Sequence, residues 1–432
     1  MKQSILRSRP LCALWFIWFA AIGQAAEYSV GALADAADTI TLEQAVRLTL
    51  ERNPELVIAN QETKALEGLT QQAGLIRNPQ LNLESEDIGA DRGLGRERFT
   101  TVRLSQVFEL GGKRQARVIA GTLAQEVASQ EAEAKRLELL GRVSNAYIEV
   151  LMGQRRLELA NEGMQLASMV VDTARKRVQA GKVPPVEETK ARIAAASAEI
   201  EFKQAERELV AARKRLALLW RDDVPQFIKA LGSLETMVAL PDLDTAIHNA
   251  QLNPLLLRSQ KFREQREAML ELEKKRRIPD VQLSAGYRRF SQSDDNAAVL
   301  GVSIPIPVFD RNQGNVQAAY ERLQQSEAEA TSVDLRIKSE ISSVYESLQA
   351  AQMESETLRT TILPAAKDAF QVARRGYELG RFGFLEVLDA QRTLFQNQIL
   401  YLRALGNYQK LVNELERLMA TPLPDRLAAV QE

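Results

Sequence analysis

The longest hydrophobic pattern in this chain is a seven-residue repeat inside a stretch that contains no proline. That stretch runs from Lys113 to Ala180, and as one helix it would be ~100 Å long. Two columns of apolar residues follow the repeat: Val143, Val150, Leu157, Met164, Val171 and Val178 in one, and Leu139, Ala146, Gly153, Ala160, Ala167 and Ala174 in the other. Large residues in one column and small residues in the other predict closely packed antiparallel helices, as in a coiled coil.

A second pattern alternates with period two and predicts strands. Leu81 and Leu83 alternate with polar residues within about 79–109, and a matching alternation falls within about 279–309. The expected apolar positions of the second pair are Val281, Leu283, Ala285, Tyr287, Leu300, Val302, Ile304 and Ile306. An ordinary half-exposed hairpin would alternate in the same way. Two hairpins alone, however, do not make a stable soluble sheet, and these strands are long enough to cross a membrane.

Sequence markers recur in the same order at a spacing close to 200 residues. Asn53-Pro54 returns as Asn253-Pro254, and Val143–Tyr147 resembles Ile341–Tyr345. The turn at Gly181 resembles the turn at Gly380. These markers predict a duplication: a first repeat over 27–220 with a helical hairpin at about 113–220, a connection over 221–240, a second repeat over 241–420 with a hairpin at about 314–420, and a tail over 421–432. Pro364 is expected to kink or break the second long helix.

The first 26 residues have the pattern of a secretory signal peptide. Lys2, Arg7 and Arg9 precede an apolar run from Leu11 to Ile22, and small residues follow at Ala25-Ala26. The apolar run has 12 residues, fewer than the ~20 that a membrane anchor needs to span a bilayer. Cys12 lies inside the apolar run, without the small residues that precede a lipidated cysteine. The sequence therefore predicts an exported protein whose mature form has no cysteine.

The amino-acid composition argues against several classes of function. The 432 residues include 56 Lys+Arg, 57 Asp+Glu, one His and one Cys. The balanced charge argues against binding to nucleic acid. One histidine and one cysteine leave no ligand set for zinc or haem and no catalytic triad, and His248 is expected to be a surface or packing residue. We therefore expect no enzyme activity, no cofactor and no resident metal.

Together, the signal peptide, the duplicated strand pairs, the long helical hairpins and the Asn-Pro motifs resemble the TolC family of outer-membrane efflux proteins. Ser85–Gly89 and Gln106–Arg114 are most similar to its cobalt–zinc–cadmium efflux branch, that of CzcC. The resemblance implies a mainly α protein with a membrane β-barrel. Three subunits would close a 12-stranded barrel in the outer membrane lipid, and their helices would form a periplasmic α-barrel. It also implies two partners, a periplasmic membrane-fusion adaptor and an inner-membrane pump of the resistance-nodulation-division class.

The same resemblance assigns roles to the two hairpin tips. Glu187, Tyr377, Glu386 and Asp389 match the positions of the family's periplasmic gate, although Phe382 stands where an arginine is expected and Arg381 is one place earlier. Gly181, Lys182, Gly380 and Arg381 match the adaptor-docking tips. Ordinary helix capping and dipole compensation would also explain the glycines and basic residues at these turns. Acidic residues likewise suit the helix starts that follow.

The predicted function is passive export of divalent heavy-metal cations through a gated trimeric duct. Acidic rings formed by Glu187, Glu386 and Asp389 would favour cations. One alternative is a duct of the same family for drugs or other small molecules. Another, from a different class, is a soluble periplasmic coiled-coil protein with a structural or adaptor role.

Overall fold

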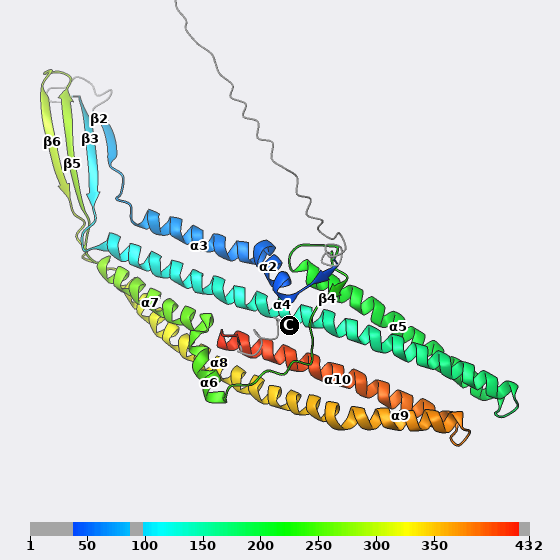
Figure 1. Cartoon of the computed structure of the whole chain (residues 1–432). Coiled ribbons are helices and arrows are strands. Elements are labelled where there is room, and N and C mark those ends of the chain that lie inside the picture. The colour runs from blue at the N-terminus through cyan, green and yellow to red at the C-terminus, as the bar shows by residue number, and fades with distance from the viewer. Residues whose placement is uncertain (1–37, 87–97, 423–432) are drawn as a thin grey trace, which may run out of the picture.

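The protein is elongated, with a small β-sheet at one end and two helical turns at the other (Figure 1). This computed structural model describes residues 38–86 and 98–422. The predicted signal peptide, the loop between the first two strands and nearly all of the predicted tail lie outside the described residues. The mainly helical fold predicted from the sequence is confirmed.

Both predicted strand pairs join one antiparallel sheet. Its strands are β2 (Gln80–Glu86), β3 (Phe99–Phe108), β5 (Val281–Phe290) and β6 (Asn296–Ser303), in the order β2-β3-β5-β6. β3 pairs with β5, so the sheet unites the two halves of the chain. Leu83 lies opposite Val102, Val102 opposite Tyr287 and Tyr287 opposite Ala298. The predicted alternation therefore places its apolar residues on one face, apart from Ile304 and Ile306.

The prediction was wrong about where the fourth strand ends. The apolar alternation continues through Ile304 and Ile306, but β6 ends at Ser303. Pro305 and Pro307 supply no backbone N–H for a ladder, and the residue before a proline is conformationally restricted. The side-chain pattern thus outlasts the strand.

The long helices fall where the seven-residue repeat predicts them. In the first half, α4 (Lys113–Gln179) turns back into α5 (Pro185–Leu218). Val143, Val150 and Ala174 are fully buried, and a Cβ on Gly153 would lie 3.2 Å from Leu209 Cδ1. The small column therefore does allow close approach of the return helix, as expected.

In the second half, the outgoing helix is interrupted but not broken. α8 (Gln313–Thr357) passes through the π-helical segment η2 (Leu358–Ile362) into α9 (Leu363–Glu378), and α10 (Phe384–Met419) returns. Pro364 lies in the first turn of α9. A wider π-turn before a proline accommodates the missing N–H and the bulk of the ring. The expected disturbance at Pro364 is thus local.

The Asn-Pro motifs join helices end to end. The shorter elements include α2 (Leu42–Arg52), α3 (Pro54–Ala73), α6 (Leu243–Asn249), η1 (Ala250–Leu252) and α7 (Pro254–Lys275). Asn53 caps α3 by accepting from Glu55 N, and its Nδ2 donates to Leu219 O at 2.8 Å. Asn253 caps α7 and donates to Leu418 O at 2.8 Å. Each buried amide thereby links the start of one helix to the end of a return helix.

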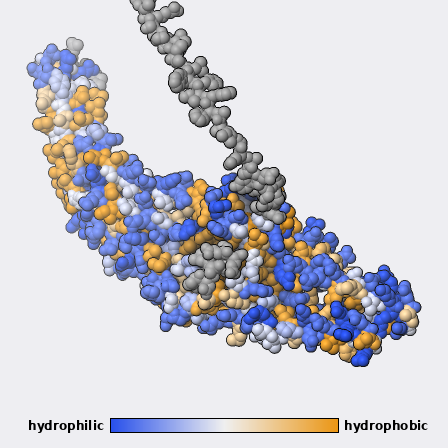
Figure 2. Space-filling view, viewed as in Figure 1, coloured by the Kyte–Doolittle hydropathy of each residue, from blue (hydrophilic) through white to orange (hydrophobic). Residues whose placement is uncertain are grey.

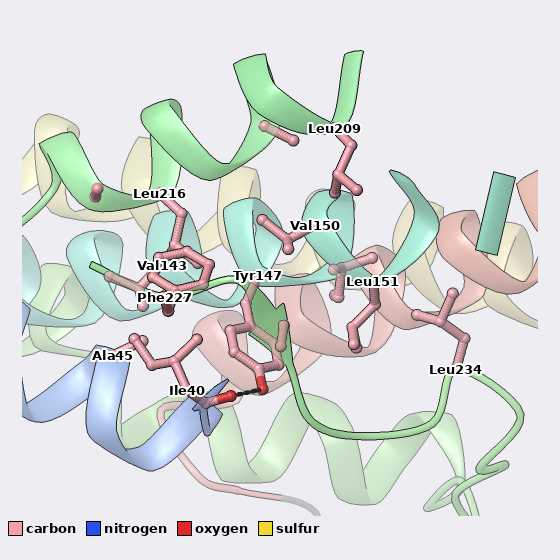
Figure 3. Close-up of a cluster of buried hydrophobic side chains, with 14 of the residues drawn as sticks. Ile40, Ala45, Val143, Tyr147, Val150, Leu151, Leu209, Leu216, Phe227 and Leu234 are labelled. Atoms are coloured by element: carbon pink, nitrogen blue, oxygen red, sulfur yellow. Dashed lines mark hydrogen bonds between the residues drawn. The ribbon is translucent and has the colours of Figure 1, made fainter. Parts of the chain in front are cut away.

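The link between the two halves crosses the middle of the bundle (Figure 1), beside the cluster of buried side chains drawn in Figure 3. Its strand β4 (Lys229–Ala230) pairs in parallel with β1 (Thr39–Ile40). Tyr147 Oη donates to Ile40 O at 2.8 Å, and burial raises the pKa of this hydroxyl to about 12. On α10, the Tyr408 hydroxyl accepts from Val238 N at 3.0 Å. Side chains of α4 and α10 thus hold the connection at mid-length.

Candidate functional site

The two hairpin tips have the same backbone design. Gly181 and Gly380 adopt φ of +66° and +75°, which favours glycine. Lys182 N donates to Arg177 O at 2.9 Å, and Arg381 N donates to Gly376 O at 2.8 Å, as in a Schellman cap. Lys182 and Arg381 are exposed just beyond these caps. Capping therefore explains the backbone of both turns. These capping hydrogen bonds join backbone atoms, so they do not require the charged side chains of Lys182 and Arg381.

A buried tyrosine joins the two hairpins near their tips. Tyr377 is only 2% exposed, and its ring lies 6.2 Å from that of Phe384. The Arg177 guanidinium lies 4.2 Å from the ring centroid and donates to Tyr377 O at 3.1 Å. The Tyr377 hydroxyl lies 3.5 Å from Glu187 Oε2, a long hydrogen bond. Burial raises the pKa of this hydroxyl, so it stays protonated and can donate to the carboxylate at neutral pH.

Only two of the four predicted gate residues meet in this protomer. Glu187 and Tyr377 come together, whereas Glu386 and Asp389 are exposed on α10. The Glu386 carboxylate lies back over the start of its own helix, close to Gly383. A Cβ added to Gly383 would lie 2.8 Å from Glu386 Oε2. Asp389 lines an open groove instead. The three acidic residues are thus all near the tips without forming one cluster in the protomer.

The arginine that joins the hairpins was not identified from the sequence. Phe382, at the position where an arginine was expected, packs on Gly376, where a Cβ would lie 2.2 Å from Phe382 Cδ2. Arg177 on the first hairpin instead stacks on Tyr377 of the second. Its signal in the sequence was a basic residue four positions before Gly181, which dipole compensation at a helix end explains equally well.

A groove of about 960 Å³ runs up from the tips between α5 and α10, with α4 as its floor. Its lining is mainly apolar, including Leu166, Ile193 and Leu385, and Lys190 and Asp389 add opposite charges. Among the described residues, no group of three or more His, Cys, Asp or Glu side chains is placed to hold a metal ion.

The sheet at the opposite end has two contrasting faces. On the apolar face, Leu83 is 69% exposed and Leu300 is 82% exposed, so no part of the described protomer covers it. On the other face, Thr101 is fully buried, Arg288 donates to Thr101 Oγ1 at 3.0 Å, and Arg103 pairs with Glu84 at 3.6 Å. Figure 2 shows apolar side chains gathered over this end of the molecule. A sheet that exposes leucine on one side and organises polar groups on the other suits a boundary between lipid and water.

Within the described ranges, no helix is both long enough and apolar enough to span a bilayer.

The sequence matches the family model described as outer membrane efflux protein over residues 45–220 and 247–421. The chain belongs to this family of outer-membrane efflux proteins, which extend into the periplasm. It is 35% identical over 385 residues to the cobalt-zinc-cadmium resistance protein CzcC of Cupriavidus metallidurans, covering 89% of this chain and 91% of that protein. It is 26% identical to the nickel-cobalt-cadmium resistance protein NccC of Alcaligenes xylosoxydans xylosoxydans, covering 69% of this chain and 67% of that protein.

The fold matches that of solved channels in the same family. The crystal structure of CusC superposes with a TM-score of 0.76 at 19% identity, covering 88% of this chain and 91% of that chain. The resemblance to the TolC family and its cobalt–zinc–cadmium branch is therefore confirmed. The family assignment replaces the alternative of a soluble periplasmic coiled-coil protein.

Proposed function

We propose that this protein is the outer-membrane duct of a tripartite efflux system that exports divalent heavy-metal cations. The observation that carries the proposal is the combination, in one protomer, of an uncovered apolar sheet face and a long helical body that carries Glu187, Glu386 and Asp389 near its tips. Such a chain has one end suited to lipid and another suited to cations in water. It conducts passively, and the energy for transport comes from a pump.

The assembly we propose is a homotrimer with a closed 12-stranded barrel. The protomer's sheet has four strands, and the outer backbone groups of β2 and β6 are left for another chain. Lipid offers no partner for such groups, so closure into a barrel is needed. The segments 27–220 and 241–420 are the two repeats of this design, and the two matched family segments support that division.

The cation cargo is inferred from the relatives and from the tips. CzcC and NccC are named for resistance to cobalt, zinc, cadmium and nickel. In a trimer, Glu187, Glu386 and Asp389 would each form a ring of three carboxylates around the periplasmic mouth, and such rings favour cations. Tyr377 and Arg177 would hold the neighbouring hairpins together until the mouth opens. Gly181, Lys182, Gly380 and Arg381 would meet the membrane-fusion adaptor, which leads to a resistance-nodulation-division pump.

Deletion and complementation in the native host test this function. Deletion should increase sensitivity to cadmium, zinc and cobalt salts, and the wild-type gene should restore tolerance. The double variant Glu386→Gln/Asp389→Asn should restore tolerance about twofold less well, because neutral rings attract cations less strongly. Glu267→Gln, an exposed acid on α7 far from the tips, is the matched control and should restore tolerance fully.

Two outcomes would count against this assignment. Increased drug sensitivity with unchanged metal tolerance would favour a duct for organic compounds. Full restoration by the double variant at equal expression would remove the acidic rings from the mechanism.

A further inference from the structure

Both lateral edges of the protomer remain open. β2 and β6 are the edge strands of the sheet, while α5 and α8 lie at opposite edges of the helical layer (Figure 1). Both helical edges expose large apolar side chains, including Ile200 at 59% on α5 and Met353 at 72% on α8. Edges of this kind on one molecule can be complementary to each other in a ring of identical copies.

The outer side of α5 combines apolar and basic residues. Leu209 and Leu216 are buried against α4, and Lys214, two positions before Leu216, lies on the opposite side of the helix. Arg207 lies seven residues earlier on the same side, and Val210 between them is 39% exposed. This edge therefore presents cations on an apolar strip.

The outer side of α8 carries the opposite charge. Leu348 is fully buried, and Glu346, two positions earlier, lies on the opposite side of the helix. Met353 follows seven residues after Glu346 on that side, with Glu354 beside it. This edge therefore presents carboxylates on an apolar strip.

The opposite charges lie at matching heights along the molecule. Arg215 of α5 and Lys410 of α10 both pair with Glu149 of α4, at 2.9 and 3.2 Å. The two hairpin tips meet at Arg177 and Tyr377, and, counted from the turns, Lys214 lies 33 residues after Gly181 while Glu346 lies 34 residues before Gly380. Lys214 and Glu346 therefore occupy the same level. Arg207 and Glu354 lie about two turns nearer the tips, because both helices rise ~1.5 Å per residue.

The charges on these two edges are available to a neighbouring copy. Two adjacent charges on α5 are already paired within the protomer, Arg215 with Glu149 and Glu208 with Arg156. Over the described ranges, Lys214, Arg207, Glu346 and Glu354 have no such ion pair. Exposed charges at fixed heights on two opposite edges are therefore free to align neighbouring copies.

We propose that α5 of one copy packs against α8 of the next, with Lys214 facing Glu346 and Arg207 facing Glu354, and with Val210 and Met353 packed between them. Copies in the same orientation satisfy this contact, and they also place β6 antiparallel to the next copy's β2, because the four strands alternate in direction. The charge pairs set the vertical register between subunits. The proposal rests on the trimeric duct proposed above and names the residues that align its subunits.

Site-directed cross-linking tests this contact directly. Cys12 is the only cysteine of the chain and lies in the predicted signal peptide, so introduced cysteines act alone in the exported protein. Lys214→Cys/Glu346→Cys, treated with a short bis-maleimide, should give bands of two and three chains on denaturing gels. Either single variant should not. Lys190→Cys/Glu346→Cys should also give none, because Lys190 lies 24 residues from Lys214 on the same helix.

A charge exchange provides the second measurement. Lys214→Glu should lower the trimer fraction in detergent about fivefold, because it replaces an attractive pair by two like charges at each of three interfaces. Adding Glu346→Lys should restore the trimer. The same change should not rescue Arg215→Glu, whose partner is Glu149 within the protomer.

The outcomes separate the two proposals. A wild-type trimer that conducts ions, but neither cross-links at these cysteines nor responds to the charge exchange, overturns the register contact and leaves the duct intact. A wild-type protein that neither oligomerises nor conducts overturns the proposed duct itself.

Discussion

At the scale of single residues, Arg177 is the side chain that connects the two hairpin tips. It leaves the first hairpin, stacks on the Tyr377 ring and donates to the Tyr377 carbonyl oxygen. A guanidinium over a tyrosine that is largely withdrawn from water combines cation–π attraction with a charged hydrogen bond. The two hairpins of one protomer are therefore held together by a contact that does not need Glu386 or Asp389.

We predict that Arg177→Gln loosens the tips. Loss of the stacking and hydrogen bond, about 1 kcal/mol at a partly exposed site, should raise the open probability in planar bilayers about fivefold without changing trimer yield. Arg175→Gln is the control, because Arg175 pairs with Asp172 at 3.1 Å and Glu188 at 3.6 Å inside its own hairpin. Equal effects of the two variants would show that loss of a basic residue, rather than of this contact, changes gating.

The sequence predicted part of this site and missed part of it, for a physical reason. Glu187 and Tyr377 were placed by their spacing from the tip glycines, and they do meet. Arg177 went unrecognised because a basic residue in the last turn of a helix has a sufficient local explanation. Its partner lies 200 residues away on another hairpin, and no local pattern records that proximity.

At the scale of elements, the Asn-Pro joints explain why these dipeptides recur. The proline suits the first turn of a helix, and the asparagine oxygen caps it. The amide nitrogen then satisfies a carbonyl at the end of another helix, a group that would otherwise lack an intrahelical partner. One buried side chain thus serves two helix ends.

We predict that Asn253→Ala destabilises the protein by about 2 kcal/mol, because it removes a cap and leaves a buried carbonyl unsatisfied. Asn253 is 2% exposed. The measurement is the midpoint of thermal or denaturant unfolding of the purified protein. Asn60→Ala, at an exposed position inside α3, should leave the midpoint nearly unchanged. A small effect at Asn253 would mean that water replaces the amide at the joint.

Element boundaries were predictable where one strong pattern acted alone. The limits of α4 followed from the stretch without proline, and β2 and β3 both lie within the strand range predicted at about 79–109. β6 was mispredicted because the side-chain alternation continues past the prolines that end its hydrogen bonding. The pairing of β3 with β5 depends on how the two halves pack, which strand patterns do not encode.

At the scale of the whole molecule, the two ends differ in surface character, apolar at the sheet and charged at the tips. The sheet exposes an apolar face, while the far tips expose Lys182 and Arg381 beyond their glycine caps. These two cations have no ion pair within the described protomer and lie at its furthest reach from the sheet. This placement suits contact with a second protein in the periplasm.

We predict that Lys182→Glu/Arg381→Glu weakens adaptor binding about tenfold without lowering trimer yield, because two rim charges change sign at each contact. The measurement is binding of the purified trimer to its adaptor at low salt, with the difference shrinking as salt rises. Arg403→Glu, exposed on α10 well away from the tips, is the control. Loss of trimer in the tip variant would instead assign these residues to assembly.

The end-to-end Asn-Pro joints also require the outgoing helix and the returning helices of each half to match in length. The outgoing helices α4 and α8–α9 are each matched by a return made of two pieces, α5 with α3 and α10 with α7. A segment inserted into one outgoing helix would pull its joint apart unless the returning pieces grew equally. Changes in reach across the periplasm are therefore expected to arise as coordinated insertions of whole heptads in both halves, which keep every packing column in phase.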